Sequence, residues 1–152
     1  MPETAVAPAR RTLSFLAFDF GTRRVGVASG NTLLQRATPL KTIQVDGDAR
    51  FAAIAKLLAE WQPDALVVGV PFHPDGAEHE NTVKARRFAR QLQGRFRLPV
   101  HEVDERYTTT EALADAAGDR KMDADAAAAA IILEQHLRQI FSPTQADDDA
   151  GT

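Results

Sequence analysis

The chain has 152 residues, of which 44% are hydrophobic and 26% are charged, and it contains no cysteine. This size and composition fit one globular domain and exclude a disulfide scaffold and a cysteine-based zinc site. The net charge is −3, but the last ten residues hold three aspartates and no basic residue, so the rest of the chain is neutral. The distribution of charge therefore matters more than its total.

The two ends of the chain differ from its middle. Residues 1–12 predict a flexible leader that lacks the apolar core of a signal peptide, and residues 142–152 predict a disordered acidic tail. One domain is therefore expected at residues 13–141. No apolar run is long enough to span a bilayer, so we expect a cytoplasmic protein without a membrane partner. The sequence leaves monomer and dimer open.

The first part of the domain is expected to form three antiparallel strands. Apolar segments of strand length span residues 13–20, 24–29 and 38–45, with short connections between them. A parallel return needs a crossover of roughly a dozen residues, which neither connection provides.

After residue 45 the pattern alternates between helix and strand. Asp48 is expected to cap a helix that ends near Glu60, and the continuous apolar run 65–70 predicts a strand covered on both faces. The later predictions are a polar loop at 71–80, a helix at 82–93, a strand at 99–103, a capping box at Thr108–Glu111 that opens another helix, and an alanine-rich helix at 124–140. This order predicts an α/β fold with one mixed five-stranded sheet, three strands antiparallel and then two parallel, and helices packed on it.

A carboxylate lies inside the first predicted strand, between Phe18 and Phe20. Burying Asp19 among apolar neighbours is costly unless the side chain has a partner. A metal ion is one such partner, and a hydrogen-bonded turn with Gly21 and Thr22 is another. Position alone does not separate these two interpretations.

Other acids lie at the ends of predicted elements. Glu105 follows the fifth strand, and the carboxyl ends of strands face the ligand cleft in open α/β sheets. Asp123 and Asp125 flank the start of the alanine-rich helix, where capping and the helix dipole also favour aspartate. Each acid alone fits an ordinary structural role. Together with Asp19 they suggest a site for Mg²⁺ or Mn²⁺, which prefer oxygen ligands and can assist phosphodiester cleavage.

The helix at 82–93 carries a basic face. No acid lies between residues 81 and 100, and the core spacing of the apolar residues places Arg86, Arg87 and Arg90 on the outside, with Lys84 nearby. A solvated helix face is the commoner meaning of such a pattern, and contact with nucleic-acid phosphates is the alternative. The loop at 71–79 is a candidate substrate loop. The histidines lack the spacing of metal ligands, which leaves them as ordinary polar positions.

Several segments resemble one known family. They are Ala17–Ala28, Val68–Pro71 with Asp75-Gly76, Asp104–Thr109, and Asp125 ahead of Ile131–Glu134. In this order, over roughly residues 13–140, the sequence resembles the YqgF/RuvX family of pre-16S rRNA nucleases and Holliday junction resolvase-like proteins. The chain departs from the family in the loop after Gly69, where Leu-Pro-Leu-Asn is common, and at Tyr107, where leucine is common.

The resemblance implies a ribonuclease H-like fold and a catalytic, metal-binding triad of Asp19, Glu105 and Asp125. Asp125 is favoured over Asp123 because its distance from the Ile-Ile-Leu run matches the family. The implied function is a Mg²⁺- or Mn²⁺-dependent nuclease of ribosome biogenesis that processes the 5′ end of pre-16S rRNA. Older naming in the family instead implies a Holliday junction resolvase that acts on branched DNA.

Two other functions fit parts of the pattern. An actin-like or sugar-kinase-like ATPase also begins its phosphate loop with Asp-x-Gly-Thr, but such enzymes need two related domains, which 152 residues cannot supply. A non-catalytic RNA-binding factor of ribosome assembly would use the basic helix alone. The choices between RNA and branched DNA, and between endonuclease and exonuclease, stay open.

Overall fold

Three antiparallel strands open the fold, as the short connections predicted. They are β1 (Ser14–Phe20), β2 (Val25–Asn31) and β3 (Arg36–Ile43). The third strand begins and ends two residues earlier than predicted. Its pairing with β2 shifts register between Val27 and Ala28, a local irregularity that apolar patterning does not reveal. The computed structural model describes residues 12–105 and 124–140.

Two parallel strands complete the sheet. β4 (Ala65–Val70) pairs with β1, and β5 (Val100–Asp104) pairs with β4, both in parallel. The sheet order is β3-β2-β1-β4-β5, so β1 is central. All six residues of β4 are buried, which explains its continuous apolar sequence. The predicted mixed five-stranded α/β sheet is confirmed.

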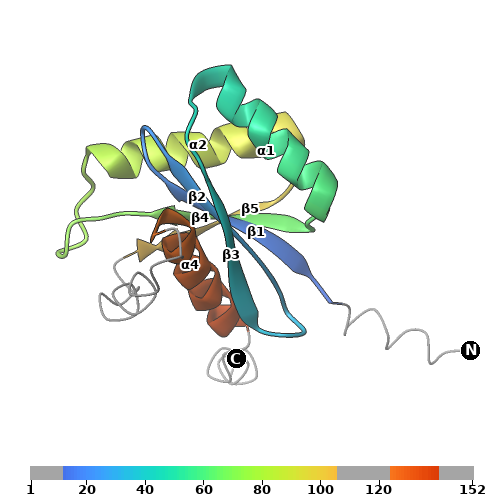
Figure 1. Cartoon of the computed structure of the whole chain (residues 1–152). Coiled ribbons are helices and arrows are strands. Elements are labelled where there is room, and N and C mark those ends of the chain that lie inside the picture. Colours follow the sequence, from blue (N-terminus) through green and yellow to red (C-terminus); the bar gives the residue numbers. More distant parts are fainter. Residues whose placement is uncertain (1–11, 106–123, 141–152) are drawn as a thin grey trace, which may run out of the picture.

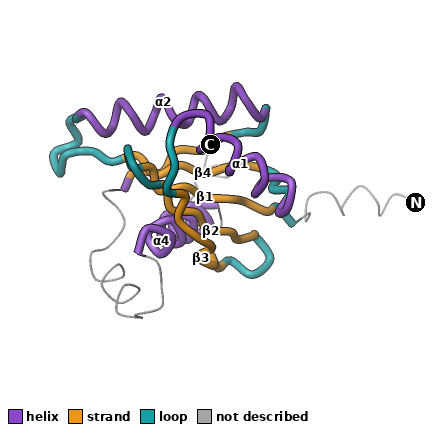
Figure 2. The backbone as a smooth tube through the Cα atoms, turned by 45° about the horizontal axis from the view of Figure 1, so that its top comes forward, coloured by secondary structure: helices purple, strands orange, loops and turns teal. Residues whose placement is uncertain are grey.

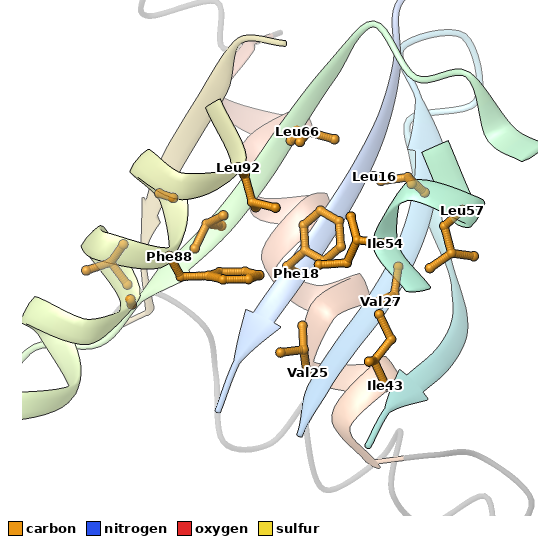
Figure 3. Close-up of a cluster of buried hydrophobic side chains, with 14 residues drawn as sticks. Leu16, Phe18, Val25, Val27, Ile43, Ile54, Leu57, Leu66, Phe88 and Leu92 are labelled. Atoms are coloured by element: carbon orange, nitrogen blue, oxygen red, sulfur yellow. The ribbon is translucent and has the colours of Figure 1, made fainter. Parts of the chain in front are cut away.

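Helices cover both faces of the sheet (Figure 1). α1 (Gly47–Trp61) and α2 (Glu80–Phe96) lie on one face, and α4 (Ala124–Ile140) lies on the other (Figure 2). The side chains of β1 alternate between the two faces. Leu16 and Phe18 enter the cluster beneath α1 and α2 (Figure 3), whereas Phe15 and Ala17 pack toward α4.

Two helices begin earlier than predicted. Residue Asp46 precedes α1 as its N-cap, not Asp48, because Gly47 adopts a positive φ of 59° and turns the chain into the helix sooner. α2 begins at Glu80 rather than residue 82, because the His79 side chain accepts a hydrogen bond from the Asn81 backbone amide at 3.1 Å. Histidine is absent from the usual capping residues, so this start had no obvious signal.

Some predictions fall outside the described residues. These are the leader at 1–12 apart from its last residue, the capping box at Thr108–Glu111 with its helix, Asp123, and the tail at 142–152. The domain boundaries therefore stay predictions. Among residues 12–105 and 124–140, no helix is both long and apolar enough to cross a membrane.

Candidate active site

Asp19 lies near the carboxyl end of the central strand, on the face that α4 covers. Strand alternation puts it in line with Phe15 and Ala17, so a carboxylate ends a stripe of buried apolar side chains. Its partner across to β2 is Gly26, and its partner across to β4 is Gly69. A glycine therefore flanks Asp19 on each side within the sheet.

The two flanking glycines leave room for the other two predicted acids. A Cβ atom on Gly69 would lie 2.7 Å from Oε2 of Glu105 and would also overlap the Ile132 side chain. A Cβ atom on Gly26 would overlap the backbone carbonyl of Asp125. The sheet thus admits Glu105 on one side of Asp19 and the first turn of α4 on the other.

The alanine-rich sequence of α4 explains its close approach to the sheet. Ala129 and Ala130 pack with Ala28 of β2, and Ala126 and Ala127 are also buried. Small side chains let the helix backbone come near the strands, as the Gly26 contact with the first turn requires. The small side chains of α4 and the glycine at position 26 of β2 together allow Asp125 to come close to the end of β1.

Asp19 and Glu105 interact directly, and burial dominates their electrostatics. Burial raises the pKa of Asp19 to about 6; the hydrogen bond from Glu105 opposes this rise and the charge of Asp125 adds to it. Burial also raises the pKa of Glu105 to about 8, helped by the charge of Asp19, by the hydrogen bond that Glu105 donates to it, and by Asp104. Without a cation the two side chains therefore hold a proton between them near neutral pH.

This pair gives the metal-free protein an expected pH dependence. Both pKa values lie above their unfolded values of 3.8 and 4.5, so the folded state binds more protons, and its stability falls as pH rises from about 4 to about 8. We expect a loss of several kcal/mol, because a pKa difference of one corresponds to about 1.4 kcal/mol; denaturant unfolding in EDTA measures this loss. Asp19→Asn should reduce this loss, because it removes the titration of Asp19 and its charge beside Glu105, while the burial that raises the pKa of Glu105 remains; an equal loss in the variant would contradict the assignment.

Asp125 is held by an arginine of the β1–β2 connection. Nε of Arg24 lies 3.1 Å from Oδ2 of Asp125, and the arginine is 62% exposed. The same connection lines a pocket of about 620 Å³, together with Asp19, Gln44 and Asp125. The pocket is therefore lined by two acids and by two arginines, Arg23 and Arg24, a set that suits a cation and a phosphate group.

The backbone of that connection is tied to α1 by a buried arginine. Arg50 is 5% exposed and donates from Nε to the carbonyl of Val45 at 3.0 Å and from Nη2 to the carbonyl of Thr22 at 3.1 Å. Its guanidinium also lies 5.7 Å from the centre of the Phe20 ring. Arg50 therefore positions one wall of the pocket.

The donor chemistry of the acids fits a hard divalent cation. Asp19 and Glu105 are in direct contact, and Asp125 is close enough for its charge to raise the pKa of Asp19. As the side chains stand, no three His, Asp or Glu residues within 12–105 and 124–140 are arranged to hold a metal ion. Glu105 is turned to Asp19 and Asp125 to Arg24, so binding would need these contacts to rearrange.

The predicted basic residues of α2 differ in their ion pairing. Arg86 pairs with Glu78 at 2.5 Å and Glu102 at 3.3 Å, and Lys84 pairs with Glu80 at 3.1 Å. These three acids lie just outside the acid-free interval of the sequence, and the fold brings them to the helix. Two members of the face, Arg87 and Arg90, are exposed and form no ion pair with a described residue.

Site residues missed by the sequence-based reasoning include Arg23, Arg24 and Gln44, which line the pocket. The two arginines directly follow Asp19-Phe20-Gly21-Thr22, so their position beside a predicted metal ligand was an available signal. Gln44 had no signal, because only the sheet brings the end of β3 to the end of β1.

The sheet order, the helices on both faces and the acids at the end of the central strand define a ribonuclease H-like α/β protein. Two solved structures of Thermus thermophilus RuvC share this fold. One has a TM-score of 0.55 at 15% identity and covers 84% of this chain and 96% of that chain. The other, in complex with a Holliday junction substrate, has a TM-score of 0.53 at 14% identity and covers 86% and 96%.

Sequence comparison places the chain within this class. A family model described as "RuvX: Holliday junction resolvase" matches residues 13–139, and the chain belongs to this family. A relative from Albidiferax ferrireducens named "Putative pre-16S rRNA nuclease" is 67% identical over 138 residues, covering 91% of this chain and 86% of the relative. One of the same name from Polaromonas is 64% identical over 127 residues, covering 84% and 89%.

Proposed function

We propose that this protein is a divalent-metal-dependent nuclease that processes the 5′ end of pre-16S rRNA in the cytoplasm during ribosome biogenesis. The observation that carries the proposal is the direct contact of two partly buried carboxyl groups, Asp19 at the end of the central strand and Glu105 just after β5. Like charges held so close need a proton or a cation between them. The family match and the names of the relatives supply the reaction class.

In this proposal Asp19, Glu105 and Asp125 hold Mg²⁺ or Mn²⁺ through their carboxylate oxygens. The cation, when bound, supplies the Lewis acidity that activates a water and stabilises the leaving oxygen of a phosphodiester. The protein residues do the rest. Glu105 gives up the proton it shares with Asp19, Asp125 turns from Arg24 toward the cation, and the exposed Arg23 offers its charge to the substrate phosphate.

Branched DNA is the second candidate substrate, because the family model itself is described as a Holliday junction resolvase. A cleavage assay that compares a pre-16S rRNA 5′ leader with a four-way DNA junction separates the two. We expect the RNA leader to be cut faster, with Asp19→Asn as the inactive control. Faster cutting of the junction would reassign the substrate, and equal product with Asp19→Asn would remove the catalytic assignment.

The basic residues of α2 are proposed to contact RNA phosphates, but through only part of the set. Arg87 and Arg90 form no ion pair with a described residue, whereas Lys84 carries an exposed ion pair of little strength. Arg86 instead joins the loop before α2 to β5 through Glu78 and Glu102. We therefore assign Arg87 and Arg90 to RNA binding and Arg86 to a structural contact.

Replacing Arg87 and Arg90 by alanine should weaken RNA binding and lower the slope of log affinity against log salt concentration. Removing one phosphate contact to a single strand lowers the slope by about 0.7, so we expect a drop of about 1.4 for the two. The measurement is fluorescence anisotropy with Asp19→Asn protein at several salt concentrations. Arg138→Ala on α4 is the matched control; an unchanged slope in the double variant would mean that this face is only solvated.

A further inference from the structure

We propose that the groove between α1 and α2 is a subsite that takes an unpaired nucleotide next to the scissile phosphate. The inference rests on the proposed nuclease function and adds where the strand goes when it leaves the carboxylates. The groove has a volume of about 320 Å³, within the lower range of small-ligand sites. Aromatic side chains form its floor and cationic side chains its walls.

Three phenylalanine rings make the floor. Phe88 is 2% exposed, and its ring centre lies 5.0 Å from that of Phe20 and 6.0 Å from that of Phe51. The planes of both neighbours are only moderately tilted from that of Phe88, by 36° and 38°. Phe20 and Phe51 are only partly buried and line the groove. The guanidinium of Arg95 already lies 4.0 Å from the centre of the Phe51 ring, so a base would stack on the parts of Phe20 and Phe51 that this contact leaves exposed.

The walls carry positive charge that the groove itself does not neutralise. Arg50 is 5% exposed, and no carboxylate among the described residues lies within ion-pairing distance of its guanidinium. Burial lowers the pKa of Arg50, and the charge of Asp46 opposes this shift. Lys84, which pairs with Glu80 at 3.1 Å, and Arg87, which has no ion pair with a described residue, line the same groove from α2. An anionic group is the ligand that this set would stabilise.

The groove borders the pocket that Asp19 and Asp125 line. Phe20 and Thr22 line both hollows. Since neighbouring residues of a strand point to opposite faces, Asp19 faces the α4 side and Phe20 faces the α1 and α2 side. A strand whose phosphate lies at the acids can therefore cross the connection at 21–24 and place its next nucleotide over the phenylalanines.

This geometry selects a single-stranded flank. A base can lie on the aromatic floor only if it is unpaired and unstacked from its neighbour, as in single-stranded RNA recognition. A duplex would have to open by one pair to use the groove. The ligand class is therefore a nucleotide within a single strand, with its base on Phe20 and Phe51 and its phosphate near Lys84 and Arg87.

The test scans a single-stranded RNA of ten nucleotides with one abasic position at a time. Binding is measured by fluorescence anisotropy in EDTA, so that no cleavage occurs. We expect one position to weaken binding about 10-fold when its base is removed, as removal of one stacked base does. Phe51→Leu, which keeps an apolar side chain, should weaken binding of intact RNA by about as much and abolish the abasic penalty at that position.

Arg87→Gln should weaken binding of intact and abasic RNA alike, and Arg138→Gln should change neither. Thermal unfolding of each variant separates local effects from loss of folding. Phe51→Tyr keeps an aromatic ring and should keep the abasic penalty, so it provides a second test if Phe51→Leu folds poorly. No abasic penalty at any position, or an equal penalty in Phe51→Leu, would overturn the subsite. If the protein does not cleave RNA with a divalent cation present but the abasic penalty persists, the nuclease function would be overturned and the subsite would stand.

Discussion

Asp19→Asn should lower the rate of RNA cleavage by about 1,000-fold or more while leaving the fold intact. The carboxylate lies between the other two acids, with Glu105 donating a hydrogen bond to it and Asp125 acting on it electrostatically. An amide of the same shape keeps the packing but removes the charge that a cation needs. Glu105→Gln and Asp125→Asn should be impaired for the same reason, and Asp19→Asn should bind RNA as well as the wild type.

A matched control is available on the surface. The side chain of Asp48 is fully exposed and lies 3.7 Å from Arg95 in a surface pair, so Asp48→Asn should leave the rate unchanged. Titration calorimetry with Mg²⁺ or Mn²⁺, with and without substrate RNA, checks the cause. Heat of binding in the wild type and none in Asp19→Asn is the expected result. No divalent binding by the wild type, even with RNA present, would end the metal-dependent proposal.

Gly26→Ala should both destabilise the protein and nearly abolish cleavage. The added methyl group would overlap the carbonyl of Asp125, which is backbone and cannot swing aside, so the first turn of α4 must move away from the sheet. Overpacking of this kind costs about 1–3 kcal/mol. Displacing a catalytic group by about 1 Å can lower a rate about 100-fold. Denaturant unfolding and the cleavage assay measure the two effects.

The control for this substitution is another glycine. Gly94 lies within α2, and a Cβ atom there would meet nothing within 4 Å. Gly94→Ala should therefore raise stability by about 0.5–1 kcal/mol and leave cleavage unchanged. If Gly26→Ala behaves like Gly94→Ala, the close packing of α4 against β2 does not set the position of Asp125.

The predictions of strands and helices agree with the structure where short-range sequence patterns carry the information. A short connection cannot return a strand in parallel, so the antiparallel start of the sheet followed from the spacing alone. The fully apolar sequence of β4 revealed its burial in the same way. Helix starts were less well predicted, because a positive φ at Gly47 and a histidine cap at His79 lie outside the usual signals.

For the site, the sequence by itself predicted three acids as candidates: Asp19 inside an apolar strand, Glu105 after the last strand and, through the family resemblance, Asp125 rather than Asp123 at a helix start. Only the tertiary structure decided how they meet, because the space beside Asp19 comes from Gly26 and Gly69 on two other strands. It also decided that Arg86 is neutralised while Arg87 is not. Spacing along a chain encodes local periodicity, whereas free volume and charge compensation depend on which distant residues pack together.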